Sequence, residues 1–404
     1  MTPDNWENIW QTLPASVKNI FRSDSDSGSY WREFLAVNPL ATFVLNDVSE
    51  LAILESFLAQ YQDHLCAGYF SYDLGMILKG VRSKYDRTQA LAVFHAYEGW
   101  WERLDGRIQR CGVDLEDSNP SESNLKSDES APEVLSSLDF TTSVQEDSYK
   151  TQIDKIHEYI RAGDIYQINY TQQLETYTDV PARHLYTKLL HQHPATYASF
   201  FECEDLALHS LSPELFLHHK AGVLTTEPIK GTRPRGRTKS EDEGQRQALL
   251  NSPKEQAELF MITDLLRNDL GEVCEIGSIS LDAVKEIREL PKVWHTYSRI
   301  SGQIDSTITP LEAFLKMFPG GSITGCPKKR ALEVIDELEI SPRGIYTGSI
   351  GYFYPGGEFC FNIAIRTLIQ KGAELSLGTG GGITIDSNWE DEWEELLLKA
   401  STFA

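Results

Sequence analysis

The stretch Ile165-Tyr166-Gln167-Ile168-Asn169-Tyr170-Thr171 alternates apolar and polar side chains along its length. Because successive side chains of a strand point to opposite faces, the pattern predicts a β-strand with Gln167, Asn169 and Thr171 together on one face. Two interpretations of this polar face stay open. It lines a wet cleft, or it is the solvated face of an antiparallel sheet.

The segments on both sides of this strand come as runs of helices and runs of strands. A helix is predicted before it from Glu146 to Ala162, because apolar residues recur at helical spacing and Gly163 follows as a terminator. Strands are predicted after it at Leu206 to Leu211, Leu215 to His218 and Gly222 to Thr225, and helices at Lys254 to Leu270, Leu311 to Met317 and Pro327 to Leu338.

The last third is predicted to contain strands at Gly348 to Tyr354, Phe359 to Ile369 and Leu375 to Gly378, and a closing helix from Asn388 to Ala404. Within the second of these strands, alternation places Asn362, Ala364 and Arg366 on one face. Since strands and helices do not alternate as βαβ units, we predict an α+β fold with antiparallel sheets.

A polar segment divides the chain. Residues 114 to 137 are rich in Ser, Asp, Glu and Pro and contain no aromatic side chain, so they bury too little apolar surface to fold alone. We therefore expect an N-terminal α+β subdomain over 1–113, a polar linker over 114–143 and a larger C-terminal region over 144–404.

The composition is that of a globular protein, with 41% hydrophobic and 24% charged residues. No apolar run is long enough to span a membrane, and the first residues lack a signal-peptide pattern, so we expect a cytoplasmic location. The net charge of −23 disfavours binding to nucleic acid or an anionic membrane. An anionic substrate would need locally clustered cations.

Such a cluster occurs in Pro228-Ile229-Lys230-Gly231-Thr232-Arg233-Pro234-Arg235-Gly236. Glycine lets a backbone approach a ligand closely, and arginine recognises carboxylates through its planar fork. Taken alone, the segment favours a basic surface turn, because it matches no phosphate-loop spacing and most lysines are solvated.

Two glycine-rich segments do not fit nucleotide binding. The segment from Gly320 to Gly325 has phosphate-loop spacing, but Cys326 and Pro327 stand where lysine and serine or threonine are required. The run from Gly378 to Gly382 does not open a helix, which excludes a dinucleotide fingerprint but leaves close backbone approach to a small carboxylate.

Two predicted helices carry carboxylates on one face. Glu255 and Glu258 share a face of the first, and Glu392, Glu395 and Lys399 share a face of the second. Each set is typical of a solvated helix surface. Brought together, they would suit a hard cation such as Mg²⁺.

Eight ordered blocks between residues 145 and 404 resemble the chorismate-utilising enzymes. They read DIYQINYTQQL, SPELFL, EPIKGTRPRG, AELFMITDLLRNDLGEVC, FPGGSITGCPKKRALEVIDELE, GSIGYF, FNIAIRTL and GTGGGITIDSNWEDEWEELLLKA. The resemblance implies a large sandwich of two antiparallel sheets flanked by helices, with an N-terminal part like that of anthranilate synthase component I. It also implies chorismate as substrate and Mg²⁺ as cofactor.

Site residues follow from the same resemblance. Glu258 and Glu395 match the magnesium ligands, with Glu392 assisting through water, and Glu214 matches the general acid that protonates the departing hydroxyl at C4. The positions that hold chorismate are matched by Gly231, Thr232, Tyr346, Arg366, Gly380, Gly381, Gly382 and Lys399. The role of His295 stays open, and the default is a half-buried strand histidine.

Two positions indicate the subfamily. Gln167 stands where the water-using members place a lysine base, which favours ammonia as nucleophile. Lys230, in PIKGT where anthranilate synthases read PIAGT, resembles the members that make 4-amino-4-deoxychorismate for 4-aminobenzoate and folate synthesis. In this reading Lys230 attacks C2, with Arg233 and Arg235 as neighbouring cations that favour its unprotonated form.

The alternatives are an anthranilate synthase component I and a catalytically silent chorismate-binding subunit. Nothing in the chain resembles a glutamine amidotransferase, so the resemblance implies that a separate amidotransferase subunit supplies ammonia. The serine-containing tryptophan motif of anthranilate synthases has no counterpart between Ala41 and Leu45, so feedback by tryptophan is not expected.

Overall fold

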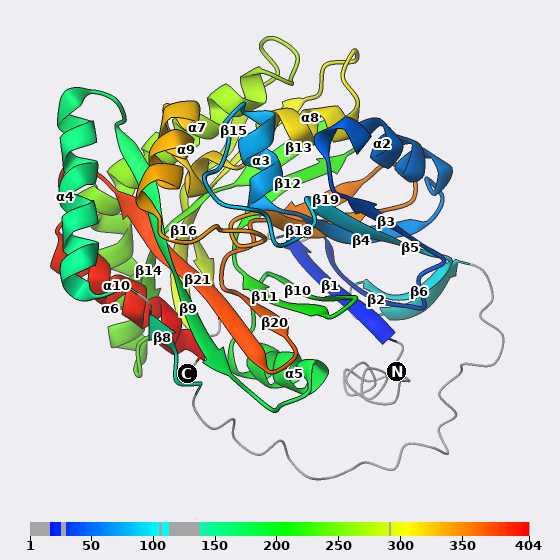
Figure 1. Cartoon of the computed structure of the whole chain (residues 1–404), viewed down its shortest axis with the longest axis horizontal. Helices are drawn as coiled ribbons and strands as arrows, with labels where there is room; N and C mark the ends of the chain where they lie inside the picture. The colour runs from blue at the N-terminus through cyan, green and yellow to red at the C-terminus, as the bar shows by residue number, and fades with distance from the viewer. Residues whose placement is uncertain are drawn as a thin grey trace.

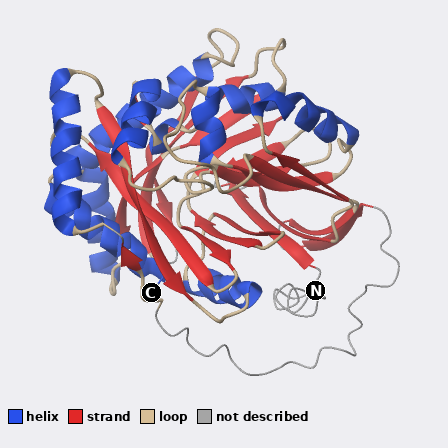
Figure 2. Ribbon diagram, viewed as in Figure 1, coloured by secondary structure: helices blue, strands red, loops and turns tan. Residues whose placement is uncertain are grey.

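The computed structural model describes residues 17–25, 30–104, 107–112, 138–142, 144–290 and 292–403. Two antiparallel sheets pack face to face in this part of the chain, and helices cover their outer faces (Figures 1 and 2). The predicted α+β sandwich is confirmed.

One sheet has 11 strands: β1 (Val17–Ser25), β2 (Tyr30–Val37), β6 (Gly99–Leu104), β7 (Arg107–Gly112), β8 (Thr141–Thr142), β9 (Gln167–Tyr177), β10 (Tyr197–Cys203), β11 (Leu206–Ser212), β17 (Gly325–Cys326), β20 (Thr367–Lys371) and β21 (Glu374–Ile383). They run in the order β17-β9-β21-β20-β11-β10-β1-β2-β6-β7, with β8 paired to β9.

The other sheet has 10 strands: β3 (Ala41–Leu45), β4 (Leu65–Phe70), β5 (Ala92–Tyr97), β12 (Leu215–Lys220), β13 (Val223–Glu227), β14 (Ile229–Pro234), β15 (Ser280–Glu289), β16 (Val293–Gln303), β18 (Ser349–Phe353) and β19 (Phe359–Asn362). Their order is β14-β16-β13-β12-β19-β18-β4-β5-β3, with β15 paired to β16.

The helices are α2 (Leu51–Gln60), α3 (Tyr72–Leu78), α4 (Glu146–Ala162), α5 (Ala182–Gln192), α6 (Lys239–Asn251), α7 (Pro253–Gly271), α8 (Pro310–Met317), α9 (Lys328–Leu338) and α10 (Trp389–Ala400), with 3₁₀ turns η1 (Val48–Glu50), η3 (Gly321–Ile323) and η4 (Ser401–Phe403). None of them combines the length and the apolar composition that crossing a bilayer requires.

Alternation along the strands builds the core in layers. On β10, Tyr197 and Phe201 point into the cluster between the two sheets, and Ala198 and Phe200 point to the outer cluster under α5. A third cluster lies on the outer face of the second sheet, where side chains of α3, α7, α8 and α9 pack. Both faces of the central strands are therefore buried, which explains their long apolar runs.

Strands from both ends of the chain share both sheets. β1, β2, β6 and β7 extend the first sheet beyond β10, and β3, β4 and β5 extend the second beyond β18. The predicted linker over 114–143 lies mostly outside the described residues; within it, Thr141–Thr142 forms β8 against β9. The domain division itself stays a prediction.

The strongest helix signals were placed correctly. α4 covers Glu146–Ala162, and Gly163 ends it with φ +79, a left-handed conformation that glycine adopts without strain.

Some elements were missed, and one was predicted wrongly. Three helices, α3, α5 and α6, were not predicted. The strand expected from Phe359 to Ile369 is two strands, because the chain leaves the second sheet after Asn362 and enters the first at Thr367. Asn362, Ala364 and Arg366 therefore do not share a strand face.

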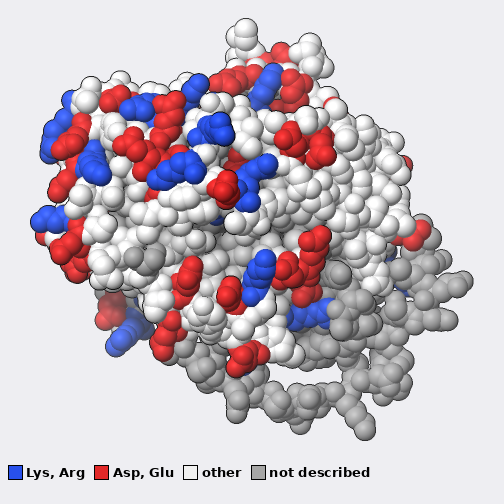
Figure 3. All heavy atoms as spheres, in the orientation of Figure 1, with Lys and Arg blue, Asp and Glu red and all other residues white. Residues whose placement is uncertain are grey.

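Charged side chains are mixed on the surface. On the face shown in Figure 3, basic and acidic groups of the described residues are interspersed rather than gathered by sign.

Candidate active site

Two crossovers between the sheets lie side by side at the centre of the sandwich. Ser212-Pro213-Glu214 carries the chain from β11 to β12, and residues 363–366 carry it from β19 to β20. They are hydrogen-bonded to each other: the Ser212 hydroxyl donates to Ile363 O at 2.6 Å, and Ile363 N donates to Glu214 O at 3.0 Å. The crossovers place Glu214 and Arg366 in fixed positions.

Glu214 is a buried acid, with 6% of its surface exposed. Burial raises the pKa of Glu214 to about 7, against the opposing effects of a hydrogen bond with Ser322 and the positive charge of Lys230. A carboxyl with this pKa is partly protonated at neutral pH and can donate a proton.

Lys230 lies on β14, an edge strand that pairs with β16. The register is interrupted between Lys230 and Thr232, and Gly231 takes φ +83 at this bulge. Such a bulge changes the direction of the neighbouring side chains. Thr296 donates its hydroxyl to Lys230 O, which holds the backbone of the bulge against β16.

The glycine run from Gly378 to Gly382 is part of β21 and pairs with β9, where Gly380 lies opposite Thr171 and Gly382 opposite Asn169. β20 pairs β21 only from Glu374 to Leu377. In the described chain no strand pairs the other edge of Gly380–Gly382, which leaves an open strand edge there apart from the hydrogen bond that Lys399 donates to Gly380 O.

Because glycine has no side chain, this run leaves space for residues of the site. A β-carbon at Gly382 would lie 2.7 Å from Gln167 Nε2 and 3.3 Å from Lys230 Nζ. At Gly381 it would lie 2.9 Å from Glu392 Oε2. Gln167 and Lys230 therefore meet at Gly382, as the sequence predicted for residues of one site. Gln167 is only 4% exposed, so the predicted polar face of Gln167, Asn169 and Thr171 is not a solvated surface at Gln167.

Lys399 joins α10 to the glycine run. Its Nζ donates to Gly380 O at 2.6 Å and lies 2.8 Å from Glu395 Oε1. The Glu395 side chain is 55% exposed. Partial desolvation would raise its pKa, but the charges of Lys399, Lys230 and Lys254 outweigh this effect and hold the pKa below its usual value. The charge of Lys254 also acts to lower the pKa of Glu392, although other effects outweigh it. The first turn of α7 therefore faces the carboxylates of α10.

Carboxylates act on one another within α7 and within α10. Burial and the neighbouring Glu395 raise the pKa of Glu392, and burial raises the pKa of Glu255, with Glu258 adding to the effect. The Glu255 Oε2 atom is buried without a hydrogen-bond partner. An unsatisfied carboxylate oxygen and neighbouring like charges are features that a divalent cation would stabilise, although the other Glu255 oxygen already pairs with Arg233 at 2.9 Å.

No group of three or more His, Cys, Asp or Glu side chains forms a ready metal centre among the described residues. Mg²⁺ is commonly held by only one or two carboxylates, with water and an anionic substrate as further ligands. Glu258 and Glu395 as its ligands therefore stay a prediction.

Arg366 is half-buried and has φ +47, outside the usual range for a non-glycine residue. Its backbone is held by a hydrogen bond from Leu211 N to Arg366 O at 2.9 Å. No carboxylate pairs with its guanidinium in the described part of the chain. A cation that is partly buried and unpaired suits a substrate carboxylate.

His295 lies beneath Thr232, whose Oγ1 is 2.9 Å from His295 Nδ1. Its exposure is 1%, less than expected from the sequence, and its Nε2 has no partner. Burial and the charge of Arg366 lower the pKa of His295 to about 3, so its imidazole is neutral.

Tyr346 closes the other end of the glycine run. It is 5% exposed, and a β-carbon at Gly378 would fall 2.2 Å from its ring, so the glycine is required for this contact. The structure thus gathers the predicted residues around β9 and β21: Lys230 and Gln167 at Gly382, Lys399 and Glu395 at Gly380, and Tyr346 at Gly378.

Arg233 and Arg235 do not have the predicted role. Arg233 Nη1 lies 2.9 Å from Glu255 Oε1, and Arg235 pairs with Asp242 at 2.6 Å and with Glu289 at 2.8 Å. Because carboxylates neutralise both guanidinium groups, neither is a free cation acting on Lys230.

Sequence reasoning missed three neighbours of the site: Ser322, Lys254 and His193. The pKa of His193 is lowered by burial, with Lys292 and Arg366 contributing, which places His193 near Arg366. Ser322 belongs to the segment from Gly320 to Gly325 that failed as a phosphate loop, and no spacing in the sequence links it to Glu214.

A family model described as chorismate binding enzyme matches residues 19–404. The chain belongs to this family. The family predicted from the eight sequence blocks is therefore confirmed.

The relatives include proteins named for two different products. A probable chloroplastic aminodeoxychorismate synthase of Oryza sativa is 43% identical over 65% of this chain, and aminodeoxychorismate synthase component 1 of Bacillus subtilis is 37% identical over 68%. An anthranilate synthase component 1 of Haloarcula marismortui is 38% identical over 82% of this chain and 73% of its own length. The chain spans 30% of the rice protein and 58% of the Bacillus protein.

Among solved structures, anthranilate synthase component I of Streptococcus pneumoniae superposes with a TM-score of 0.78 at 26% identity, covering 94% of this chain and 93% of that one. The isochorismate synthase DhbC of Bacillus anthracis, at 19% identity and a TM-score of 0.74, shares the fold.

Proposed function

We propose that this member of the chorismate binding enzyme family converts chorismate and ammonia to 4-amino-4-deoxychorismate. The observation that carries the proposal is the position of Lys230, which meets Gln167 at Gly382 and acts electrostatically on the buried acid Glu214. Relatives named aminodeoxychorismate synthase support the product.

The chemistry divides one displacement into two. Lys230, after giving up a proton, attacks C2 of chorismate; both ring double bonds shift, the C4–O bond breaks, and Glu214 gives its proton to the departing hydroxyl, which leaves as water. Ammonia then attacks C4, both double bonds return to their original positions, and the C2–N bond to Lys230 breaks. Ammonia loses one proton in this second step, and Glu214 recovers its proton from solvent or from the incoming ammonia.

The amide side chain of Gln167 disfavours water as a competing nucleophile. An amide side chain cannot take a proton from water, so the position opposite Lys230 offers no base for water attack. This favours ammonia, which is nucleophilic without a base.

Arg366 and Lys399 supply the cations that an anionic substrate needs in a chain of net charge −23. Glu258 and Glu395 would hold Mg²⁺, with Glu392 assisting through water. When bound, the ion would neutralise carboxylate charge on chorismate and fix its orientation. Gly231, Thr232, Tyr346 and the open edge of Gly380–Gly382 would contact the remaining substrate surface.

Ammonia is proposed to come from a separate glutamine amidotransferase. If so, glutamine supports turnover only when that subunit is added, while ammonium salts at high pH support turnover of this chain alone. The location is proposed to be cytoplasmic.

Product analysis tests the proposal. The purified chain is incubated with chorismate, Mg²⁺ and ammonium, and products are separated by chromatography and identified by mass. We expect 4-amino-4-deoxychorismate; anthranilate with pyruvate, or isochorismate, as the main product would overturn the proposal.

Anthranilate synthase component I is the second candidate, because the Haloarcula relative and the Streptococcus structure carry that name over most of this chain. The lysine at position 230 disfavours this candidate. A silent chorismate-binding subunit would bind chorismate without turnover, although all of Lys230, Glu214, Glu258 and Glu395 are present.

A further inference from the structure

Glu339 and Arg343 form an ion pair that is almost completely buried, with 3% and 5% of their surfaces exposed. Glu339 follows the last residue of α9, and Arg343 lies four residues later in the loop before β18. Arg343 donates from Nη2 to Glu339 Oε1 at 2.7 Å and from Nε to Glu339 Oε2 at 2.9 Å. Its guanidinium also lies 4.6 Å from the ring centroid of Tyr72.

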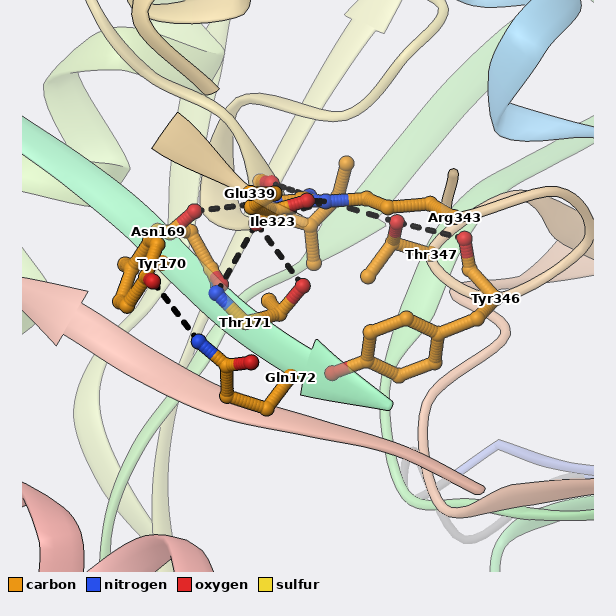
Figure 4. A network of polar contacts seen from close by, with 9 residues as sticks. All are labelled: Asn169, Tyr170, Thr171, Gln172, Ile323, Glu339, Arg343, Tyr346 and Thr347. Carbon is orange, nitrogen blue, oxygen red and sulfur yellow. Dashed lines mark hydrogen bonds and ion pairs between the residues drawn. The ribbon is translucent and has the colours of Figure 1, made fainter. Parts of the chain in front are cut away.

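This pair binds three other segments of the chain (Figure 4). Arg343 donates to Asn169 O at 2.6 Å, to Ile323 O at 2.8 Å and to the Thr347 hydroxyl at 3.3 Å. Glu339 Oε1 accepts from both the backbone N–H and the hydroxyl of Thr171, at 2.9 Å each. The planar guanidinium fixes the distances between its acceptors, which a lysine ammonium on a flexible stem does not.

Each bound segment carries a group of the proposed active site. Asn169 and Thr171 lie opposite Gly382 and Gly380 on β21. Ile323 directly follows Ser322, which hydrogen-bonds to the carboxyl of Glu214. Thr347 directly follows Tyr346, and its hydroxyl donates to Tyr346 O at 2.6 Å.

We propose that Arg343 is a positioning residue of the active site, which holds Ser322 against the acid Glu214 and Tyr346 against the glycine run through a single buried guanidinium. The inference rests on the proposed function in assigning Glu214 as the acid. Among the described residues, Arg343 reaches the residues proposed to contact chorismate only through these segments.

The position of Arg343 would also affect the pKa of Glu214. Charged and polar groups that face Glu214 are Lys230 on β14 and Ser322 on η3, and both favour its ionised form. If Arg343 no longer holds Ile323, Ser322 moves and one of these two effects is lost. The pKa of Glu214 then rises, and the pH above which the acid is ionised moves upward by about one unit.

Arg343→Lys tests this, since it keeps the positive charge beside Glu339, Tyr72 and Tyr346 but removes the fork. Ser322→Ala removes only the hydrogen bond to Glu214 and should produce the same upward shift. Arg32→Lys is the matched control: Arg32 pairs with the buried Glu102 at 2.7 Å and lies 4.2 Å from the Tyr354 ring, on β2 at the far part of the first sheet. It should lose stability without moving the pKa of Glu214.

Two readouts keep the inference separate from the proposed function. The first is the basic limb of kcat against pH for whichever product wild type makes from chorismate. The second needs no activity: it is the pH dependence of the stability change caused by Glu214→Gln, measured in the wild-type, Arg343→Lys, Ser322→Ala and Arg32→Lys backgrounds. A wrong product refutes the function but leaves the second readout intact.

The expected result is an upward shift of about one pH unit in Arg343→Lys and in Ser322→Ala, and none in Arg32→Lys. If Arg343→Lys and Arg32→Lys both lose stability and neither moves the pKa of Glu214, Arg343 is only a structural residue and the inference is overturned. Should Arg343→Lys not fold, Thr347→Val removes one acceptor of the same guanidinium and is expected to give a smaller shift in the same direction. An unchanged pKa in that variant would also overturn the inference.

Discussion

Replacing Glu214 by glutamine tests the buried acid without relying on its activity. Burial raises the pKa of the Glu214 carboxyl from 4.5 to about 7 in the folded chain. As pH rises above 4.5, the unfolded chain loses this proton before the folded chain does. The folded state is therefore fully favoured below the unfolded pKa and loses stability until the pH passes the folded pKa.

The size of the effect follows from the pKa difference. Integrating proton binding over the two states gives a loss of about 2.5 kcal/mol in the free energy of unfolding between about pH 5 and about pH 8. Glutamine has nearly the same shape and does not titrate. The variant should therefore gain about 2.5 kcal/mol relative to wild type over this pH interval.

Urea unfolding followed by tryptophan fluorescence measures this difference at both pH values. Glu394→Gln, an exposed glutamate on α10, is the control and should show no pH-dependent gain. If the stability difference between Glu214→Gln and wild type is the same at both pH values, the raised pKa of Glu214 is wrong, and with it the proton-donor role.

Other substitutions test the remaining parts of the site. Gly382→Ala puts a methyl group 3.3 Å from Lys230 Nζ. The kcat should therefore fall about tenfold or more, measured by steady-state kinetics, while thermal unfolding should show little loss of stability. Glu395→Gln should raise the magnesium concentration for half-maximal activity by about tenfold or more, and the exposed neighbour Glu394→Gln should leave it unchanged; equal behaviour would refute the ligand assignment. Arg366→Lys should raise the KM for chorismate by about tenfold, because lysine cannot reproduce a forked contact to carboxylate, and an unchanged KM would show that Arg366 does not hold the substrate.

Local signals in the sequence predicted many elements well. α4 was predicted to the residue, because its apolar spacing and the left-handed Gly163 agree. α6 was missed although a signal was present: Thr238 and Glu241 form a capping box, which the nearly uniform polarity of the following residues concealed.

Features that depend on two distant segments were not predictable. The alternation of Asn362, Ala364 and Arg366 suggests one strand, and only the three-dimensional structure shows that the chain crosses between sheets at this point. The partners of Arg233 and Arg235 are carboxylates on α6, α7 and β15, which no spacing in the nine-residue segment indicates. The same is true of the Glu339–Arg343 pair, whose acceptors come from β9, η3 and the loop before β18.

In the proposed function, Lys230 is the residue that distinguishes between the two products for which the relatives are named. The most direct test compares the products that wild type and Lys230→Arg form from chorismate, Mg²⁺ and ammonium. Arginine keeps the positive charge but is a poor nucleophile. We predict 4-amino-4-deoxychorismate from wild type and a loss of at least about a hundredfold in its formation by the variant. Formation of the same product at the wild-type rate by Lys230→Arg, or anthranilate as the main wild-type product, would contradict the account.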